Sequence, residues 1–98
     1  MTKLVIETQA ALDIEDAARW YENQLIGLGV DFVLEVEFAI KRVQKNPKLY
    51  IQSYRSTRRA LLHRFPYAMY FVVNEIEIRI LAVLHQVKSD KAVILRLL

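Results

Sequence analysis

The chain has 98 residues, 54% of them hydrophobic and 26% charged, which is typical of one globular domain and excludes a disordered chain. It contains no cysteine, so disulfides, thiolate zinc sites and cysteine nucleophiles are excluded. It has no uncharged apolar run of 18 residues, and its start, MTKLVIETQ, lacks the apolar region of a signal peptide; we therefore expect a cytoplasmic protein.

The net charge of +3 conceals an asymmetry between the two halves of the chain. Residues 1–50 hold six lysines and arginines against eight acidic residues, a net of −2. Residues 51–98 hold eight against three, a net of +5. This segregation predicts a positive face on the C-terminal half, suited to phosphate backbones or to an acidic protein segment.

The N-terminal quarter predicts a strand followed by a helix. Residues 3–7 (KLVIE) have a β-branched centre typical of a strand. Residues 8–25 space their apolar side chains at 3.6 residues, with Thr8 as the expected helix cap and with acidic residues in the first half, where the helix dipole favours them. Gly27 and Gly29, the only glycines, break this helix.

A second helix is predicted over residues 30–45. Its expected apolar face comprises Phe32, Val33, Val36, Ala39, Ile40 and Val43. The helix ends at Asn46-Pro47, because proline disfavours helical geometry in the residue before it. The short connection between the two helices indicates an antiparallel hairpin.

The C-terminal half predicts an antiparallel meander. An irregular basic stretch, residues 48–57, comes first. The strands predicted after it cover residues 59–65, 67–73 and 76–84, with a tight turn at Asn74-Glu75. In the last strand, Ile76, Ile78, Ile80 and Ala82 alternate with other residues, the pattern of a half-buried sheet.

These elements predict one α+β domain over residues 1–98, in the order β-α-α-β-β-β. The helical hairpin packs on a small antiparallel sheet, which the first strand joins, giving two layers. The tail, residues 89–98, predicts one or two helical turns capped by Ser89 or Asp90. Its apolar side chains either pack on the core or meet a partner protein.

Over roughly Ala10 to Lys88 the chain resembles the RelE/ParE superfamily of toxins from type II toxin–antitoxin (plasmid stabilisation) modules. The resemblance rests on Ala10, Asp13 and Ile14 in an A-x-x-D-I opening, on Trp20-Tyr21-Glu22, on Gly29 with Phe32, on Asn46-Pro47, and on the segments RRALLHRFPYAMYFVV and ILAVLHQ. It implies a toxin that a partner antitoxin holds inactive. Members divide between ribosome-dependent mRNA endonucleases and inhibitors of DNA gyrase, and the fold alone does not decide between them.

A cationic cluster precedes the middle strand, with no acid among its members. It comprises Arg55, Arg58, Arg59, His63 and Arg64. Strand alternation would place Arg59 and His63 on one face and Arg64 on the other. The cluster is a candidate site for an acidic antitoxin or for RNA phosphates; the alternative is a charged sheet edge that discourages aggregation.

A candidate catalytic set would comprise His85, Arg59, Arg64 and Lys88, if the protein is a nuclease. Histidine is a general acid or base near neutral pH, and RelE-like nucleases place such groups in this region. Two departures weigh against cleavage. Ala68 stands where those nucleases typically carry arginine, and Val87 precedes Lys88 where many relatives have further arginines.

Aromatic residues and cofactor motifs add little. Tyr50, Tyr54, Tyr67 and Tyr70 are candidates for stacking on bases, although core positions are the commoner role for tyrosine. Trp20 is expected to pack between its helix and a neighbouring element. No metal motif, phosphate loop or nucleophile turn occurs, so no cofactor is expected.

The sequence therefore favours a ParE-like toxin that arrests growth by blocking a macromolecular target, with gyrase favoured, and that forms a hetero-oligomer with an acidic antitoxin. The first alternative is a ribosome-dependent mRNA endonuclease acting through the candidate catalytic set, so enzymatic activity stays open. A further alternative is a non-toxic relative that serves only as a binding module.

Overall fold

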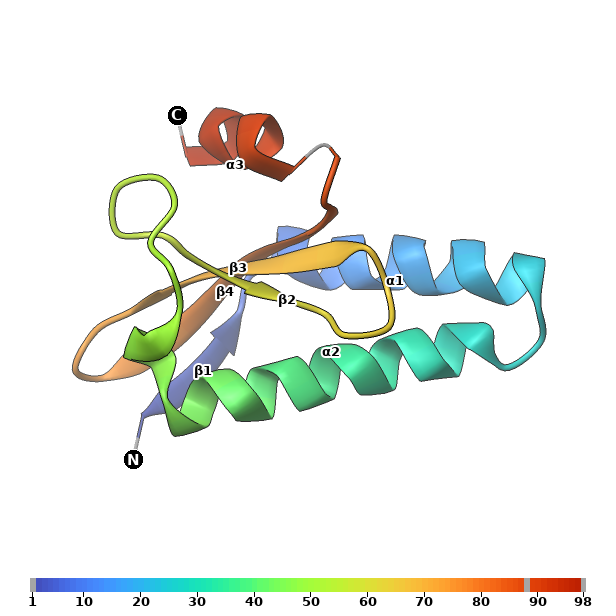
Figure 1. Cartoon of the computed structure of the whole chain (residues 1–98), viewed down its shortest axis with the longest axis horizontal. Coiled ribbons are helices and arrows are strands. Elements are labelled where there is room, and N and C mark those ends of the chain that lie inside the picture. Colours follow the sequence, from blue (N-terminus) through green and yellow to red (C-terminus); the bar gives the residue numbers. More distant parts are fainter. Residues whose placement is uncertain (1, 88, 98) are drawn as a thin grey trace.

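The computed structural model describes residues 2–87 and 89–97. Its elements follow the predicted order (Figure 1). They are β1 (Lys3–Ile6), α1 (Thr8–Gln24), α2 (Leu28–Lys45), the 3₁₀ turn η1 (Pro47–Leu49), β2 (Arg58–Leu61), β3 (Tyr67–Val73), β4 (Glu77–His85) and α3 (Ser89–Leu97). The α+β class is thereby confirmed.

The four strands form one sheet in the order β1-β4-β3-β2. β2, β3 and β4 are antiparallel neighbours, as the meander predicts. β1 joins the same sheet by pairing with β4 in parallel, with Lys3 opposite Glu77 and Ile6 opposite Ile80. In the sequence, these two neighbouring parallel strands are separated by the helical hairpin and by β2 and β3, so the chain makes a long crossover connection between them.

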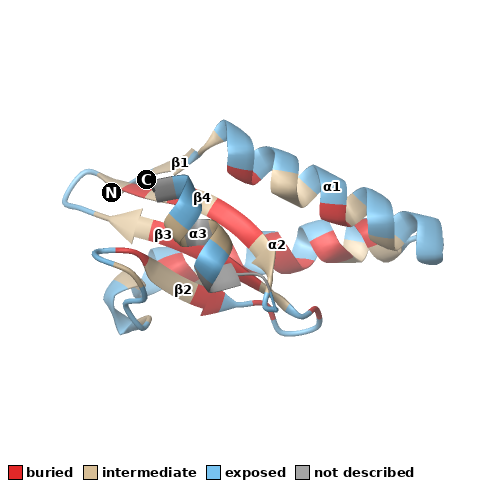
Figure 2. Cartoon of the chain, turned by 90° about the horizontal axis from the view of Figure 1, so that it is seen from above, coloured by how far each residue is buried: buried red, intermediate tan, exposed pale blue. Residues whose placement is uncertain are grey.

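The helical hairpin covers one face of the sheet, which we call the helix face (Figure 1). Phe32 and Val36 of α2 and Ala17 of α1 are buried there against Met69 and Phe71 of β3. Figure 2 shows the buried stripes along the strands and on the sheet-facing sides of both helices. Removing this apolar surface from water is the main stabilising contribution available to a chain of this size.

The opposite face of the sheet, which we call the outer face, has its own small cluster. Ala68, Tyr70 and Ala82 are buried in it, with Leu84 packed beside them. α3 lies across this face, on the side away from α2 (Figures 1 and 2). The helix α3 thus lies on the domain, although its Leu95 side chain is 68% exposed; a partner that meets the apolar side chains of the tail stays a prediction.

A bulge between β3 and β4 places the Ala82 side chain on the face of the sheet opposite to the predicted one. Tyr70 lies opposite Ala82, whereas the next residue, Phe71, lies opposite Ile80, so Leu81 has no partner in the register. The predicted alternation is therefore wrong at Ala82, which lies on the outer face while Ile80 belongs to the helix-face core. An extra residue in one strand shifts the period-2 pattern by one.

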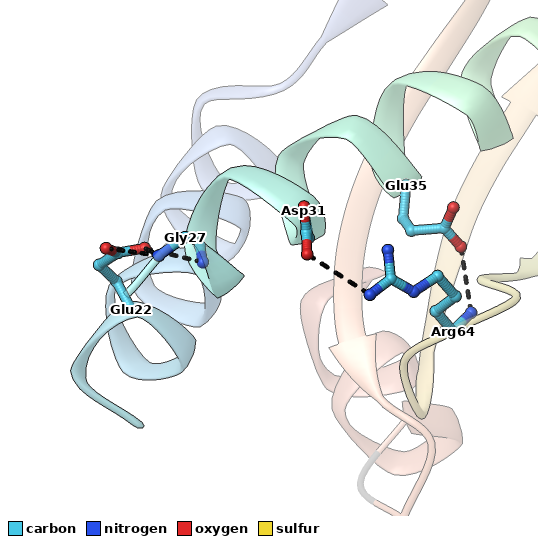
Figure 3. A network of polar contacts seen from close by, with 6 residues as sticks. Glu22, Gly27, Asp31, Glu35 and Arg64 are labelled. Carbon is cyan, nitrogen blue, oxygen red and sulfur yellow. Dashed lines mark hydrogen bonds and ion pairs between the residues drawn. The ribbon is translucent and has the colours of Figure 1, made fainter. Parts of the chain in front are cut away.

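The two helix starts differ from prediction. α1 begins at Thr8 after Glu7, and no side chain caps it, so the predicted Thr8 cap is wrong. α2 begins at Leu28, two residues early, after Gly27 in the left-handed conformation at φ 93°. The Glu22 carboxylate accepts hydrogen bonds from the N–H groups of Gly27 and Gly29 at 3.0–3.1 Å, which fixes the turn (Figure 3).

β2 ends at Leu61, four residues before the predicted end at Phe65. The reason lies in α2. Arg42 donates a hydrogen bond to the Leu61 carbonyl at 3.4 Å, and the buried Glu35 carboxylate accepts one from the Arg64 N–H at 3.0 Å. These bonds direct residues 62–66 toward the helix instead of along the ladder.

Candidate functional site

His85 ends β4 beside α1, on the helix face. It lies opposite Tyr67 in the register, and the two rings meet edge-on at 5.3 Å between centroids. Together with Trp20 and Tyr21 they line a hollow of about 280 Å³. The His85 Nδ1 accepts a hydrogen bond from the Val87 N–H at 3.2 Å, so the neutral ring carries its proton on Nε2. A hydrogen bond within the chain end that follows β4 thus satisfies this ring nitrogen.

Burial raises the pKa of the Tyr21 hydroxyl. It also raises the pKa of the Tyr67 hydroxyl, to which the neighbouring Tyr21 adds a smaller increase. Both phenols therefore stay protonated at neutral pH. Neither is a candidate for a general base near pH 7, since a base must be poised to accept a proton there.

Arg59, near the start of β2, lies on the outer face of the sheet. It lies opposite Tyr70, which in turn lies opposite Ala82, and both partners belong to the outer-face cluster. His85 is in register with Tyr67, a neighbour of the helix-face core. The structure therefore places Arg59 and His85 on opposite faces of the sheet and does not bring them together around one substrate position.

Arg58 and Arg55 lie at the basic loop, residues 51–57. Arg58 donates hydrogen bonds to the carbonyls of Tyr50 at 2.7 Å and Lys48 at 3.3 Å, so it holds the loop to the end of β2. Arg55 is exposed, has a φ of 55°, and places its guanidinium 5.1 Å from the centre of the Tyr54 ring. Arg55 is thus presented to solvent, while Arg58 serves the loop's structure.

His63 and Arg64 lie in the turn between β2 and β3, not on a strand. The predicted alternation of Arg59, His63 and Arg64 across two strand faces is therefore wrong. The Arg64 guanidinium lies 3.4 Å from Asp31 of α2 and 5.6 Å from the centre of the Phe65 ring. Figure 3 shows Arg64 held by α2 at both its backbone and its side chain.

The five cationic residues therefore divide into two groups. Arg55, Arg58 and Arg59 share one end of β2 and its loop, whereas His63 and Arg64 lie beyond its other end. Of the candidate catalytic set, His85, Arg59 and Arg64 occupy three separate places in the fold. Lys88 lies outside the described residues.

The remaining aromatic candidates have mixed positions. Tyr70 is buried, and Tyr50 packs edge-on against Phe71 at 5.8 Å. Tyr54 lies under Arg55 in the loop. Trp20 is 57% exposed, so the prediction that it packs between elements is wrong. Val33, predicted on the apolar face of α2, is also exposed.

Sequence reasoning missed an ion pair that attaches α3 to the domain. Arg96 donates two hydrogen bonds of 2.8 Å to the Asp13 carboxylate and one of 3.2 Å to the Leu81 carbonyl. The same carboxylate accepts the Val83 N–H at 3.0 Å. The only sequence signal was the acidic character of the first half of α1, and nothing indicated a partner for Asp13 that lies 83 residues away.

Within residues 2–87 and 89–97, no group of three or more histidine or acidic side chains is placed to hold a metal ion. In the same part of the chain, no helix is long and apolar enough to cross a membrane.

Comparison with solved structures identifies a shared fold. A chain in the structure described as "Chromosomal ParDE TA system from P. aeruginosa" is similar to this chain, with a TM-score of 0.73 and 22% sequence identity. The match covers 85% of this chain and 94% of that chain. No family model matches the sequence, and no curated protein matches it. The order, pairing and layers described above are therefore those of a fold found in a ParDE toxin–antitoxin structure.

Proposed function

We propose that the protein is the toxin of a type II toxin–antitoxin pair and that it arrests growth by blocking DNA gyrase. The observation that carries this proposal is the fold shared with a chain of a ParDE system over most of both chains. The segments that resemble the RelE/ParE superfamily extend over this fold from α1 to the end of β4.

The arrangement of the cationic residues supports a blocker over a nuclease. Cleavage of RNA through its 2′-hydroxyl needs proton transfer and phosphate stabilisation at one place. Arg59 and His85 lie on opposite faces, and Arg64 is paired with Asp31. At the position where family nucleases carry arginine, Ala68 is buried on the outer face.

The cognate antitoxin would dock at the loop and outer edge formed by residues 51–59. Arg55 is exposed there and Arg59 is half-buried, and the C-terminal half carries the positive charge excess. An acidic, partly disordered segment that orders on binding suits such a surface. The affinity for this segment would fall as the salt concentration rises, because salt screens the attraction between exposed charges.

A supercoiling assay with purified gyrase tests the proposal. The protein should inhibit supercoiling, and Arg55→Ala should weaken inhibition about 5- to 30-fold, the effect of losing one charged contact worth about 1–2 kcal/mol. Arg19→Ala, which removes an exposed arginine on α1 away from this surface, should leave inhibition unchanged. Gyrase left fully active, together with codon-dependent mRNA cleavage on ribosomes that His85→Ala abolishes, would contradict the proposal and establish the endonuclease.

A further inference from the structure

The hollow beside His85 is surrounded by aromatic rings. Trp20, Tyr21, Tyr67 and His85 line it. Trp20 meets Tyr21 edge-on at 5.1 Å, and Tyr21 meets Tyr67 at 6.1 Å with an interplanar angle of 63°. The rings are thus held at steep angles to one another, an arrangement that leaves ring faces and edges open to an occupant. Trp20 is more than half exposed although it is the largest apolar side chain in the protein.

A second hollow of about 280 Å³ continues from the first toward the start of α1. It shares Trp20, Tyr67 and His85 with the first and adds the carboxylates of Asp13 and Asp16. Both oxygens of Asp13 are already engaged by Arg96. The Asp16 carboxylate lies 3.4 Å from the Arg19 guanidinium, and its side chain is 74% exposed. Asp16 therefore keeps acceptor capacity for a further donor.

The charge of this site is opposite to that of the basic loop. Among the described residues, no lysine or arginine lines either hollow, whereas two carboxylates do. Aromatic ring faces carry negative electrostatic potential, which attracts cations within about 6 Å of the ring centre. A carboxylate at the edge of such rings adds a hydrogen-bond acceptor for an N–H donor.

We propose that these two adjoining hollows bind the side chain of one arginine or lysine from a partner protein. The aliphatic stem lies on Trp20 and Tyr67, and the cationic head reaches the Asp16 carboxylate. The site is independent of the acidic-segment surface at residues 51–59. In this proposal the His85 ring lines the binding pocket and transfers no proton.

A nucleobase is the competing occupant, because aromatic side chains also stack on bases. The charges decide against it. A nucleotide brings a phosphate, which would meet Asp13 and Asp16, and the arginines that pair with these two carboxylates do not line the hollow. The nearest arginines, Arg19 and Arg96, already pair with acidic side chains.

Trp20 reports on the site directly, because it is the only tryptophan in the chain. The probe is N-acetyl-arginine amide, and its matched control is N-acetyl-citrulline amide, which has nearly the same shape without the charge. Arginine amide should change the tryptophan fluorescence saturably and bind about two- to fivefold more tightly than citrulline amide, as expected for an exposed cation–π contact. Equal affinities for the two probes would overturn the proposal.

Two variants and a nucleotide complete the experiment. Asp16→Asn should reduce the preference for arginine amide over citrulline amide, and Trp20→Leu should abolish arginine binding measured by NMR shifts of the His85 and Tyr67 rings. Ile26→Ala, a change at a 91% exposed side chain outside both hollows, should alter neither. Because Trp20, Asp16 and Ile26 are exposed, the fold should survive each change.

Saturable binding of adenosine monophosphate with no binding of arginine amide would overturn the proposal and identify a base-stacking site.

Discussion

At the scale of single residues, Asp13 connects three elements of the fold that are far apart in the sequence. Its carboxylate, 9% exposed, joins α1 to the backbone of β4 and to Arg96 of α3. A carboxylate this far removed from water needs its donors, since an unpaired buried charge is costly. The same pair raises the pKa of the Arg96 guanidinium, chiefly through the hydrogen bond to Asp13.

Breaking this link should lower stability. Arg96→Leu leaves the Asp13 carboxylate without its cation, and we expect a loss of roughly 1–3 kcal/mol in the free energy of unfolding, measured by urea titration. The isosteric change Asp13→Asn keeps an acceptor for Val83 and should cost less. Lys91→Leu, an exposed change on the same helix, is the control. Equal stabilities for the Arg96 and Lys91 variants would contradict this role.

The half-buried Tyr21 and Tyr67 predict an alkaline limit to stability. Their pKa values are raised in the folded chain, so the folded state holds these protons more tightly than the unfolded state. That stability is fully present below the unfolded pKa of about 10 and is lost as pH rises through the folded pKa values. Thermal midpoints should therefore fall above pH 10, and the fall should be smaller in Tyr21→Phe/Tyr67→Phe. An identical fall in the double variant would contradict the assignment.

At the scale of elements, the close approach of α1 and α2 depends on Gly29. A Cβ there would lie 2.6 Å from the Ala18 carbonyl oxygen, a backbone atom that cannot move alone. Gly29→Ala should therefore force the helices apart at a cost of about 1–3 kcal/mol, despite the better helix propensity of alanine. Ile26→Ala in the adjacent turn is the control, with both variants compared by urea titration. A Gly29→Ala variant as stable as the parent would contradict this prediction and show that the space between α1 and α2 accommodates a methyl group.

The elements themselves were largely predictable from local patterns. Residues 67–73 match β3 at both ends, because proline and the Asn74 turn bound an apolar run. The end of β2 was not predictable, since its cause is Glu35 and Arg42 on α2, far away in sequence. The bulge at Leu81 was also not predictable, because nothing in an unbroken run of apolar residues indicates where the strand register shifts.

The candidate site was less predictable than the fold. Sequence proximity suggested that Arg55 to Arg64 formed one surface, but the ladder and the turn divide them between different places. The aromatic hollow was missed because its walls come from α1, β3 and β4, and because a lone tryptophan in a helix usually indicates packing. Only the register places Tyr67 beside His85, and only helix packing places both beside Trp20.

At the scale of the whole molecule, the charge asymmetry of the sequence separates two surfaces. The loop and β2 edge near Arg55 are cationic, whereas the hollow along α1 is lined by Asp13 and Asp16. A partner that covers the first surface should be acidic there, and a partner side chain in the hollow should be basic. Salt should weaken binding at both, since both rest partly on charge.

Pulse labelling after induced expression tests the central claim most directly. Incorporation of thymidine and of methionine would be followed over the first minutes, before secondary effects of growth arrest appear. A gyrase-blocking toxin predicts that DNA synthesis falls first while protein synthesis continues. An early collapse of protein synthesis with DNA synthesis intact would contradict the account and identify an mRNA endonuclease, and undisturbed growth would contradict toxicity altogether.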